Sequence, residues 1–271
     1  MNNAGKKIFI TGSTDGLGKL VARHMAEQGA EVLLHGRNEQ KGKKVLDELK
    51  NHAPKAILKY YNGDFSSLKE VSDLADRILK EHDHIDILIN NAAIGSGKAS
   101  GNAREESTDG LELRMSVNYF AQVLLTEKLL PLLKPGSNII NVASTAQARV
   151  NFSDLMLRNH YDGYHAYSAS KTALVMYTFD LAERLREKDI KVNAVHPSSL
   201  MNTNMVIKDW GYTLSKVEDG AEAVENLLSP ELTGAYFDKK KPVKAISQAY
   251  DLAAREELRS QTFRILGNFL K

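Results

Sequence analysis

The sequence predicts an α/β fold, a single domain built on a doubly wound parallel sheet of about seven strands with helices on both faces. Two observations lead to this prediction. Short apolar segments alternate along the 271 residues with longer segments of helical periodicity, which indicates βαβ units. The first apolar segment, 7–11, also runs through a glycine-rich turn directly into a helix. No repeat, linker or low-complexity tract divides the chain, so one domain over 1–271 is expected.

The predicted elements follow one another in the order that such a sheet requires. Strands are expected near residues 7–11, 31–36, 56–61, 85–90, 137–143, 190–195 and 234–237. Helices are expected near 16–28, 39–52, 67–82, 109–133 and 165–187. Ser67 and Glu70 form a capping-box pattern at the start of the third helix. Pro131 falls late in the fourth helix and is expected to bend it.

Composition excludes several classes of partner. Lys and Arg total 36 against 34 Asp and Glu, and the run 239–241 is typical of a solvated turn, so no nucleic-acid partner is expected. No apolar run approaches ~18 residues and no apolar signal core opens the chain, so no membrane insertion is predicted. The absence of cysteine agrees with a reducing, cytoplasmic location. The eight histidines are scattered, and no metal site is predicted.

The turn after the first strand has the pattern of a phosphate-binding loop. It reads Thr-Gly-Ser-Thr-Asp-Gly-Leu-Gly over 11–18. Gly12 permits the tight turn, Gly16 lets backbone N–H groups approach a pyrophosphate, and Gly18 allows the helix to pack closely on the strand. The start of the following helix would face the anion. The pattern favours a Rossmann-type dinucleotide site over a plain strand-to-helix loop.

Tyr167 and Lys171 are the second informative feature. Four residues apart on a helix, the two side chains lie on one face. A free tyrosine has a pKa near ~10, and a neighbouring cation favours the phenolate and lowers that pKa. The pair could therefore serve in general acid–base chemistry. A solvated surface pair is the alternative when the two residues are taken alone.

Together, the glycine loop and the Tyr-x-x-x-Lys pair resemble the short-chain dehydrogenase/reductase family over nearly the whole chain. The resemblance implies four catalytic residues, Asn118, Ser144, Tyr167 and Lys171. Tyr167 would exchange the proton, and Lys171 would lower its pKa and hold the nicotinamide ribose. Ser144 would hydrogen-bond the carbonyl oxygen, and Asn118 would anchor a water that relays protons.

The same resemblance implies the contacts of a dinucleotide. Asp64 is expected beside the adenine ring, Asn91 and Ala92 at the border of the cofactor, and Pro197 with Thr203 near the nicotinamide carboxamide and pyrophosphate. The full set of expected cofactor-binding residues is Gly12, Ser13, Asp15, Gly16, Leu17, Gly18, Arg37, Asp64, Asn91, Ala92, Tyr167, Lys171, Pro197 and Thr203.

The end of the second strand indicates which dinucleotide is used. An enzyme that prefers NAD would place a carboxylate there to hold the ribose hydroxyls. By register against the family, Gly36 stands at that position and Arg37 follows. A guanidinium can bind the 2′-phosphate in a bidentate manner, so NADP(H) is predicted over NAD(H). Lys41 could add charge, although a solvated side chain is the favoured interpretation.

Two regions are expected to determine the substrate. The insertion at about 145–166 resembles the branch that contains retinol dehydrogenases and protochlorophyllide reductases, as does the Gly-x-Tyr-Phe segment 234–237. The insertion would form either one wall of an apolar pocket or a surface helix packed on the core. Its relevant side chains are Phe152, Leu155, Met156, Leu157, Tyr161 and Tyr164. The substrate loop at about 199–220 would be either a lid or a pair of core helices.

The predicted function is an NADP(H)-dependent oxidoreductase that transfers a hydride between nicotinamide and the carbonyl or alcohol of an apolar small molecule. The alternative is a non-catalytic NADP(H)-binding redox sensor or assembly partner. By family analogy, two copies could pair through the helices 109–133 and 165–187 as a homo-oligomer.

Overall fold

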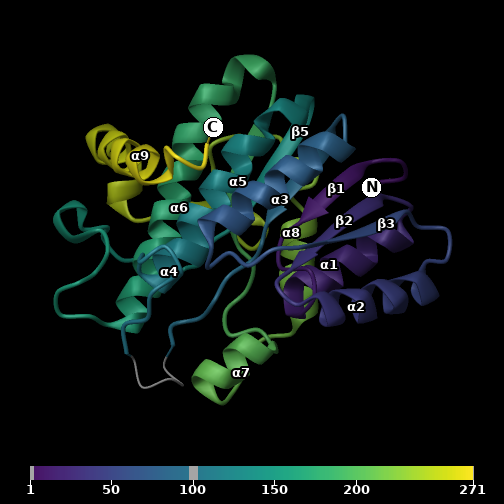
Figure 1. Cartoon of the computed structure of the whole chain (residues 1–271), viewed down its shortest axis with the longest axis horizontal. Coiled ribbons are helices and arrows are strands. Elements are labelled where there is room, and N and C mark those ends of the chain that lie inside the picture. The colour runs from purple at the N-terminus through teal and green to yellow at the C-terminus, as the bar shows by residue number, and fades with distance from the viewer. Residues whose placement is uncertain (1–2, 98–102, 271) are drawn as a thin grey trace.

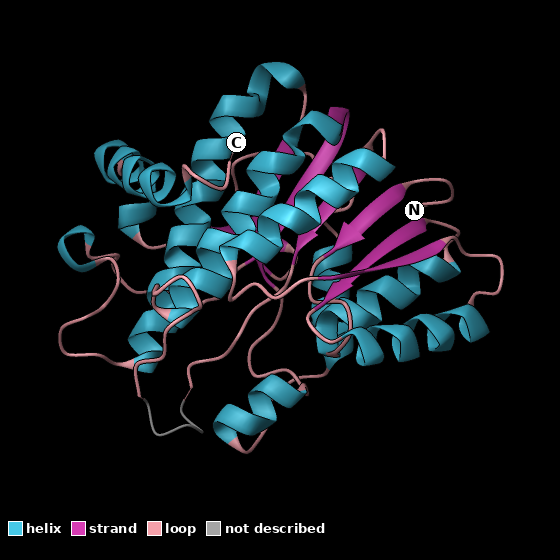
Figure 2. Ribbon diagram, viewed as in Figure 1, coloured by secondary structure: helices cyan, strands magenta, loops and turns pink. Residues whose placement is uncertain are grey.

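The computed structural model describes residues 3–97 and 103–270, which form one α/β domain around a single sheet (Figures 1 and 2). Its strands are β1 (Lys7–Ile10), β2 (Glu31–Gly36), β3 (Leu58–Asn62), β4 (Ile85–Asn90), β5 (Leu133–Val142), β6 (Lys191–His196), β7 (Tyr236–Asp238) and β8 (Lys241–Val243). The spatial order is β3-β2-β1-β4-β5-β6-β7-β8. All neighbours are parallel except β8, which turns back antiparallel to β7 and was not predicted.

Helices cover both faces of the sheet, as predicted. They are α1 (Gly16–Glu27), α2 (Glu39–His52), α3 (Leu68–Glu81), α4 (Leu113–Met115), α5 (Ala121–Leu129), α6 (Gly163–Leu185), α7 (Asn204–Trp210), α8 (Val217–Glu225) and α9 (Leu252–Leu266). One hydrophobic cluster joins α3, α5 and α6 to one face of the strands, and a second joins α1, α2 and α8 to the other. Both faces of the sheet are therefore dry, which explains the nearly continuous apolar strands.

The strand order places the topological switch point of the sheet at the carboxyl ends of β1 and β4, and the crevice denotes here the region between the loops that leave these two strand ends. From β1 the chain first adds β2 and β3 on one side, and then crosses to β4 on the other side. The loops after β1 and β4 consequently diverge to opposite faces, and this switch point is where open α/β sheets bind ligands.

The predicted helix 109–133 is interrupted in the structure. Helix α4 passes through a π-helical segment (Ser116–Phe120) into α5, which ends at Leu129. Pro131 lies in the 3-10 turn Leu130–Leu132, so it ends the helix rather than bending it. The next strand begins at Leu133, earlier than predicted, with a register shift opposite Ile85 and Ile87.

Only half of the predicted capping box forms. The Ser67 hydroxyl accepts a hydrogen bond from the Glu70 N–H at 3.3 Å. The Glu70 carboxylate does not return to Ser67; it accepts from the backbone N–H of Asp64 at 2.8 Å. Glu70 thereby holds the loop between β3 and α3 instead of closing the box.

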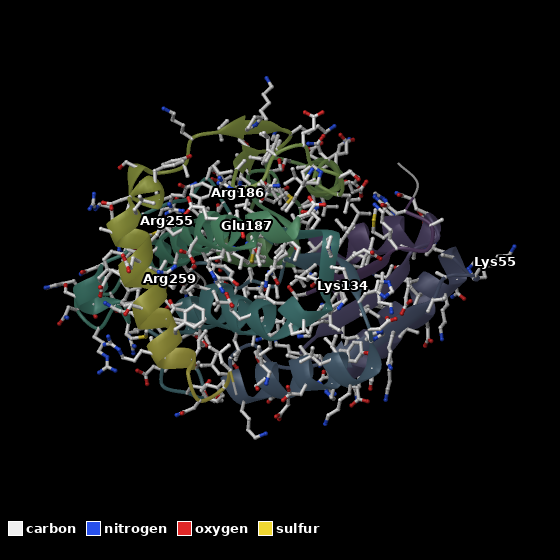
Figure 3. The ribbon with its side chains drawn as sticks, turned by 90° about the horizontal axis from the view of Figure 1, so that it is seen from above. Lys55, Lys134, Arg186, Glu187, Arg255 and Arg259 are labelled. Atoms are coloured by element: carbon white, nitrogen blue, oxygen red, sulfur yellow. The ribbon has the colours of Figure 1, made fainter. Side chains whose placement is uncertain are left out.

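Helix α9 was not predicted, and it lies against α6. Arg255 and Arg259, both on the yellow helix of Figure 3, form ion pairs with Glu183 and Asp180 of α6, each at 3.1 Å. Leu258 is buried between them at 2% exposure. Helix α9 thus covers part of the helix 165–187 that was expected to pair two copies.

We expect Leu258→Ala to lower the free energy of unfolding by about 2–5 kcal/mol, because it leaves a cavity under α9. Leu252→Ala is the matched control, since Leu252 is 67% exposed in the same helix. Urea unfolding followed by circular dichroism measures both variants. Equal unfolding midpoints for the two variants would show that α9 does not pack as described.

Candidate active site

The loop between β1 and α1 approaches the end of β4 so closely that it requires glycine. A Cβ on Gly12, where φ is +64°, would lie 2.7 Å from the Cα of Ala92. A Cβ on Gly18 would collide with the Asn91 amide and lie 2.5 Å from the Gly12 carbonyl oxygen. Gly16 has φ +47° and faces the Thr203 methyl group, which a Cβ would approach to 3.0 Å. Gly12 therefore forms the tight turn and Gly18 the close packing that were predicted for them, whereas the approach of a pyrophosphate to Gly16 stays a prediction.

Asn91 and Ala92 fasten this loop to β4. The Asn91 side-chain amide donates to the carbonyl oxygens of Thr11 at 2.8 Å and Gly12 at 3.2 Å. The backbone N–H groups of Asn91 and Ala92 both donate to the Thr11 hydroxyl at 2.9 Å. These bonds fix the distance between the two strand ends that border the crevice.

His35 is a supporting residue that sequence reasoning missed. It is 2% exposed in β2 and stacks on Phe65 with ring centroids 4.4 Å apart. Its Nδ1 accepts from the Gly12 N–H at 3.2 Å, and its Nε2 lies 3.0 Å from the Gly63 carbonyl oxygen. These partners assign the neutral Nε2–H tautomer. Burial lowers the pKa of His35 to about 4, so the ring stays neutral while it supports the loop.

Ser13, Asp15 and Leu17 lie on the same loop but face different ways. The Ser13 hydroxyl accepts from the His35 N–H at 2.9 Å, so its side chain points toward β2. Asp15 caps α1 by accepting from the Gly16 N–H at 2.9 Å. Leu17 is buried among the residues of α1 and its neighbours. Within the described residues, the N–H groups of Leu17 and Gly18 have no hydrogen-bond acceptor, as the first turn of an anion-binding helix requires.

The end of β2 presents a cation and no carboxylate. Gly36 is enclosed, since a Cβ there would lie 2.7 Å from the Thr14 methyl carbon, so an acidic side chain does not fit without moving Thr14. Arg37 is exposed, and no partner for its guanidinium is seen in the described part of the chain. Lys41 is exposed, as expected, and its ammonium also binds the Asp15 carboxylate at 2.7 Å. Asp64 accepts from the Ser66 N–H at 2.9 Å and so shapes the turn after β3.

Three of the predicted catalytic side chains meet where β5 ends against α6. The Ser144 side chain lies beside the Tyr167 hydroxyl, where it acts to lower the pKa of Tyr167. Lys171 is 2% exposed, and its ammonium donates to the Val142 carbonyl oxygen at 2.8 Å. The same nitrogen lies 5.9 Å from the centre of the Tyr167 ring. Tyr167 itself is only partly buried, so its hydroxyl remains close to the crevice.

The electrostatics differ from the expectation that Lys171 lowers the pKa of Tyr167. Burial raises the pKa of Tyr167 above its ordinary value, and the nearby Ser144 side chain offsets only part of that effect. Burial also lowers the pKa of Lys171 to about 8, which weakens the cation. In the ligand-free protein the phenol consequently keeps its proton at neutral pH.

Asn118 lies in the π-helical segment and is fully buried. Its amide oxygen accepts from the Ile94 N–H at 2.8 Å, and its amide nitrogen donates to the Ser170 hydroxyl at 3.1 Å. It therefore links the loop after β4 to α6, beside the Tyr167–Lys171 pair. Among the described residues, the Asn118 side chain makes its hydrogen bonds to Ile94 and Ser170 rather than to Lys171, and the water relay stays a prediction.

Pro197 and Thr203 follow β6 toward the same crevice. Pro197 is buried, and the next residue, Ser198, is 5% exposed with a hydroxyl that has no partner within the described residues. Thr203 caps α7 and faces Gly16 across the loop. A buried hydroxyl without a partner, a free helix start and a glycine cradle together fit an extended polar ligand such as a dinucleotide.

Helix α7 is not a core helix. Of its residues only Val206 is buried, while Met205 and Ile207 are 36% and 47% exposed. Of the pair of core helices that was one alternative for this segment, only α8 is a core helix, since its small residues Ala221 and Ala223 are buried. Closure of the segment 199–220 over a substrate stays a prediction.

The insertion 145–166 packs on the core, as in the second of its two alternatives, but it forms no surface helix of its own ahead of α6. It contains one 3-10 turn (Phe152–Asp154), and Leu155 and Leu157 are buried in the α3–α5–α6 cluster. Tyr161 donates to the Glu112 carboxylate at 2.9 Å and accepts from Arg114 at 2.9 Å, which anchors the end of the insertion. The other alternative, that the insertion forms one wall of an apolar substrate pocket, stays a prediction.

An α/β sheet with a glycine-lined crevice and a Ser–Tyr–Lys cluster defines a nucleotide-binding oxidoreductase of the Rossmann type. The family model described as short chain dehydrogenase matches residues 6–210. The chain belongs to this short-chain dehydrogenase/reductase family and resembles its retinol dehydrogenases.

The similar proteins agree with this assignment. Retinol dehydrogenase 12 of Mus musculus is 30% identical over 97% of this chain and 87% of its own length. Retinol dehydrogenase 13 of Mus musculus is 34% identical over 71% of this chain, and the chain spans 58% of that protein. A structure from Mycobacterium Paratuberculosis has a TM-score of 0.81 with 25% identity and covers 97% of this chain and 94% of its own. A short chain dehydrogenase of Burkholderia cenocepacia J2315 in complex with NADP shares the fold, with a TM-score of 0.70, 24% identity, and coverage of 88% and 97%.

We expect stability to fall as the pH drops from about 6.5 to about 4. In the unfolded chain His35 takes up a proton near its ordinary pKa, whereas the folded protein resists protonation down to about 4. The unfolded state thus binds more protons between these two pH values. The free energy of unfolding should therefore fall by about 3 kcal/mol across this range.

Urea unfolding of wild type and His35→Gln at several pH values between 4 and 7 measures this effect. The variant should be less stable at pH 7, and its loss of stability toward pH 4 should be about 2–3 kcal/mol smaller. His52→Gln is the control, because His52 is exposed on α2. An unchanged slope in His35→Gln would contradict the assigned role.

Proposed function

We propose that this protein is an NADP(H)-dependent oxidoreductase that interconverts the carbonyl and alcohol of an apolar small molecule. The observation that carries the proposal is the cluster of Tyr167, Ser144 and the buried Lys171, in which the Lys171 ammonium lies 5.9 Å from the centre of the Tyr167 ring. A phenol that is protonated at neutral pH and lies beside a second hydroxyl can deliver a proton to one oxygen atom. The glycine loop supports a dinucleotide on the neighbouring strand end.

The roles of the side chains follow from their positions. A bound nicotinamide would supply or accept the hydride. Tyr167 donates its proton to the substrate oxygen in reduction and recovers it in oxidation. Ser144 donates a hydrogen bond to the same oxygen, and this bond matters most while negative charge accumulates there. Lys171 supplies a buried ammonium held against the Val142 carbonyl, and we assign it to the ribose hydroxyls of the nicotinamide.

The preference for NADP(H) rests on the end of β2. Gly36 has no room for the carboxylate that would hold the ribose hydroxyls of NAD, and the exposed Arg37 guanidinium is available for a phosphate. The remaining predicted contacts, including Asp64 near adenine and Thr203 near the pyrophosphate, belong to the same proposal.

Apolar substrates are favoured by the side chains near the mouth of the crevice. Tyr164, 49% exposed at the start of α6, meets Trp210 of α7 edge to face with ring centroids 6.2 Å apart. Met205 lies exposed on the same short helix. The relatives named retinol dehydrogenases point in the same direction.

Location and assembly stay predictions. In the part of the chain that the structure describes, no helix is long and apolar enough to cross a bilayer. A cytoplasmic location and a homo-oligomer both remain to be measured. A non-catalytic NADP(H)-binding sensor would need the loop and Arg37 but not the Ser144–Tyr167–Lys171 cluster, so we do not favour it.

We expect Tyr167→Phe to lower turnover by about 10²–10⁴-fold, because the proton donor is lost while the ring still fills its place. NADPH oxidation with a panel of aldehydes, ketones and quinones measures turnover, and calorimetry should show nearly unchanged NADPH binding. Tyr164→Phe is the control, since it removes a hydroxyl one turn earlier and should keep turnover within about threefold. Unimpaired turnover in Tyr167→Phe would remove the mechanism. Silence of the wild type across the panel with clear NADPH binding would favour the sensor.

Arg37→Ala tests the choice of coenzyme. Loss of a charge-assisted bond of about 1.5–3 kcal/mol should raise KM for NADPH by about 10–100-fold and leave KM for NADH nearly unchanged. Lys43→Ala is the control, because it removes an exposed cation of α2 that is paired with Glu39. It should change neither the KM for NADPH nor the KM for NADH. An equal effect of Arg37→Ala on both coenzymes would argue against a 2′-phosphate contact.

A further inference from the structure

The segment that carries α7 leaves the sheet after β6 and is closed at its base. The Asn202 N–H donates to the Ser215 carbonyl oxygen at 2.9 Å, and the Leu214 N–H donates to the Leu200 carbonyl oxygen at 2.9 Å. Between these bonds, α7 lies at the tip of the segment and stands apart from the sheet in Figure 1. Gly211, with φ +76°, ends the helix and lets the chain return. The segment is thus a loop with a fixed neck and a helical tip.

The tip touches three other parts of the protein. At its start, Asn204 donates to both oxygens of the Asp15 carboxylate at 3.0 and 3.2 Å. At its end, Asp209 accepts from the Ser96 hydroxyl at 3.1 Å. Trp210 meets the ring of Tyr164 at the start of α6. The contact of Asn204 is the one that reaches the glycine loop.

Asp15 collects donors from three elements at once. Besides Asn204, it accepts from the Gly16 N–H of α1 at 2.9 Å and from the Lys41 ammonium of α2 at 2.7 Å. Although burial opposes ionisation, the bonds from Lys41 and Asn204 outweigh it and lower the pKa of Asp15. The carboxylate is therefore charged at neutral pH, and its bond to the Asn204 amide is charge-assisted.

We propose that Asp15 is a positioning residue which, through Asn204, holds helix α7 to the glycine loop, so that coenzyme binding and closure of α7 favour each other. This step rests on the proposed function, because it takes the dinucleotide to bind at the glycine loop. A ligand that immobilises the loop also immobilises Asp15, and the ordering cost of docking α7 then falls. The coupling is reciprocal, since a docked α7 equally favours the ligand-ready loop.

Trp210 reports on this motion directly, because it is the only tryptophan of the chain and lies on α7. We measure acrylamide quenching of its fluorescence with and without saturating NADP⁺. In ligand-free protein, Asn204→Ala should raise the quenching constant about twofold over wild type, because α7 undocks more often. Saturating NADP⁺ should lower the constant of wild type by about half and that of Asn204→Ala much less.

Lys208→Ala is the matched control, since Lys208 is exposed on the same helix, and it should behave as wild type in both conditions. Identical quenching of Asn204→Ala and wild type, with and without NADP⁺, would overturn the proposal. If the quenching constant of the wild type does not change with NADP⁺ while calorimetry shows that the dinucleotide is bound, the coupling is overturned. If calorimetry shows no dinucleotide binding, the proposed function fails. The two ligand-free proteins then still decide whether Asp15 and Asn204 hold α7.

Discussion

The structure depends on the close contact between the glycine loop and the end of β4. Gly12 and Gly18 permit an approach that any Cβ would prevent, and Asn91 then hydrogen-bonds the loop across the gap. Because β1 and β4 are neighbours at the switch point of the sheet, this contact determines the width of the crevice. Every residue assigned to dinucleotide binding is placed relative to it.

Buried polar side chains then align the second half of the site with the first. The Asn90 amide of β4 donates to Asn141 of β5, and Asn141 in turn donates to Thr178 of α6, both at 2.8 Å. Asn118 makes a further connection from the loop after β4 to α6. Such buried bonds specify one arrangement of strands and helix, since a shift would leave further polar groups unpaired. They hold the helix that carries Tyr167 in register with the strand that leads to Ser144.

Local patterns made the first half of the protein predictable. Helix α1 was expected at 16–28 and runs over Gly16–Glu27, because the glycine loop and the apolar spacing that follows are both short-range signals. The residues proposed as catalytic were likewise identified from short sequence patterns, although their contacts were not. The raised pKa of Tyr167 depends on burial by distant segments, which a four-residue spacing does not reveal.

Other features depend on partners far away in the sequence. In the sequence, His35 is only a polar residue within a strand. Its supporting role follows from the folded structure, in which its two ring nitrogens contact Gly12 and Gly63. Helix α9 packs on α6, which supplies Glu183 and Asp180 for its arginines, and these partners lie more than 70 residues away in the sequence. The π-helical segment around Asn118 has no composition signal that distinguishes it from an ordinary helix.

The short strand β8 has a consequence for how the molecule behaves at high concentration. It forms one outer edge of the sheet with the sequence Lys-Pro-Val, all three residues exposed. Pro242 has no N–H to offer an incoming strand, and the charge of Lys241 opposes stacking of identical copies. A sheet that otherwise consists of apolar parallel strands is thereby protected at this edge from adding strands of a neighbouring molecule, and so from growing into a fibril.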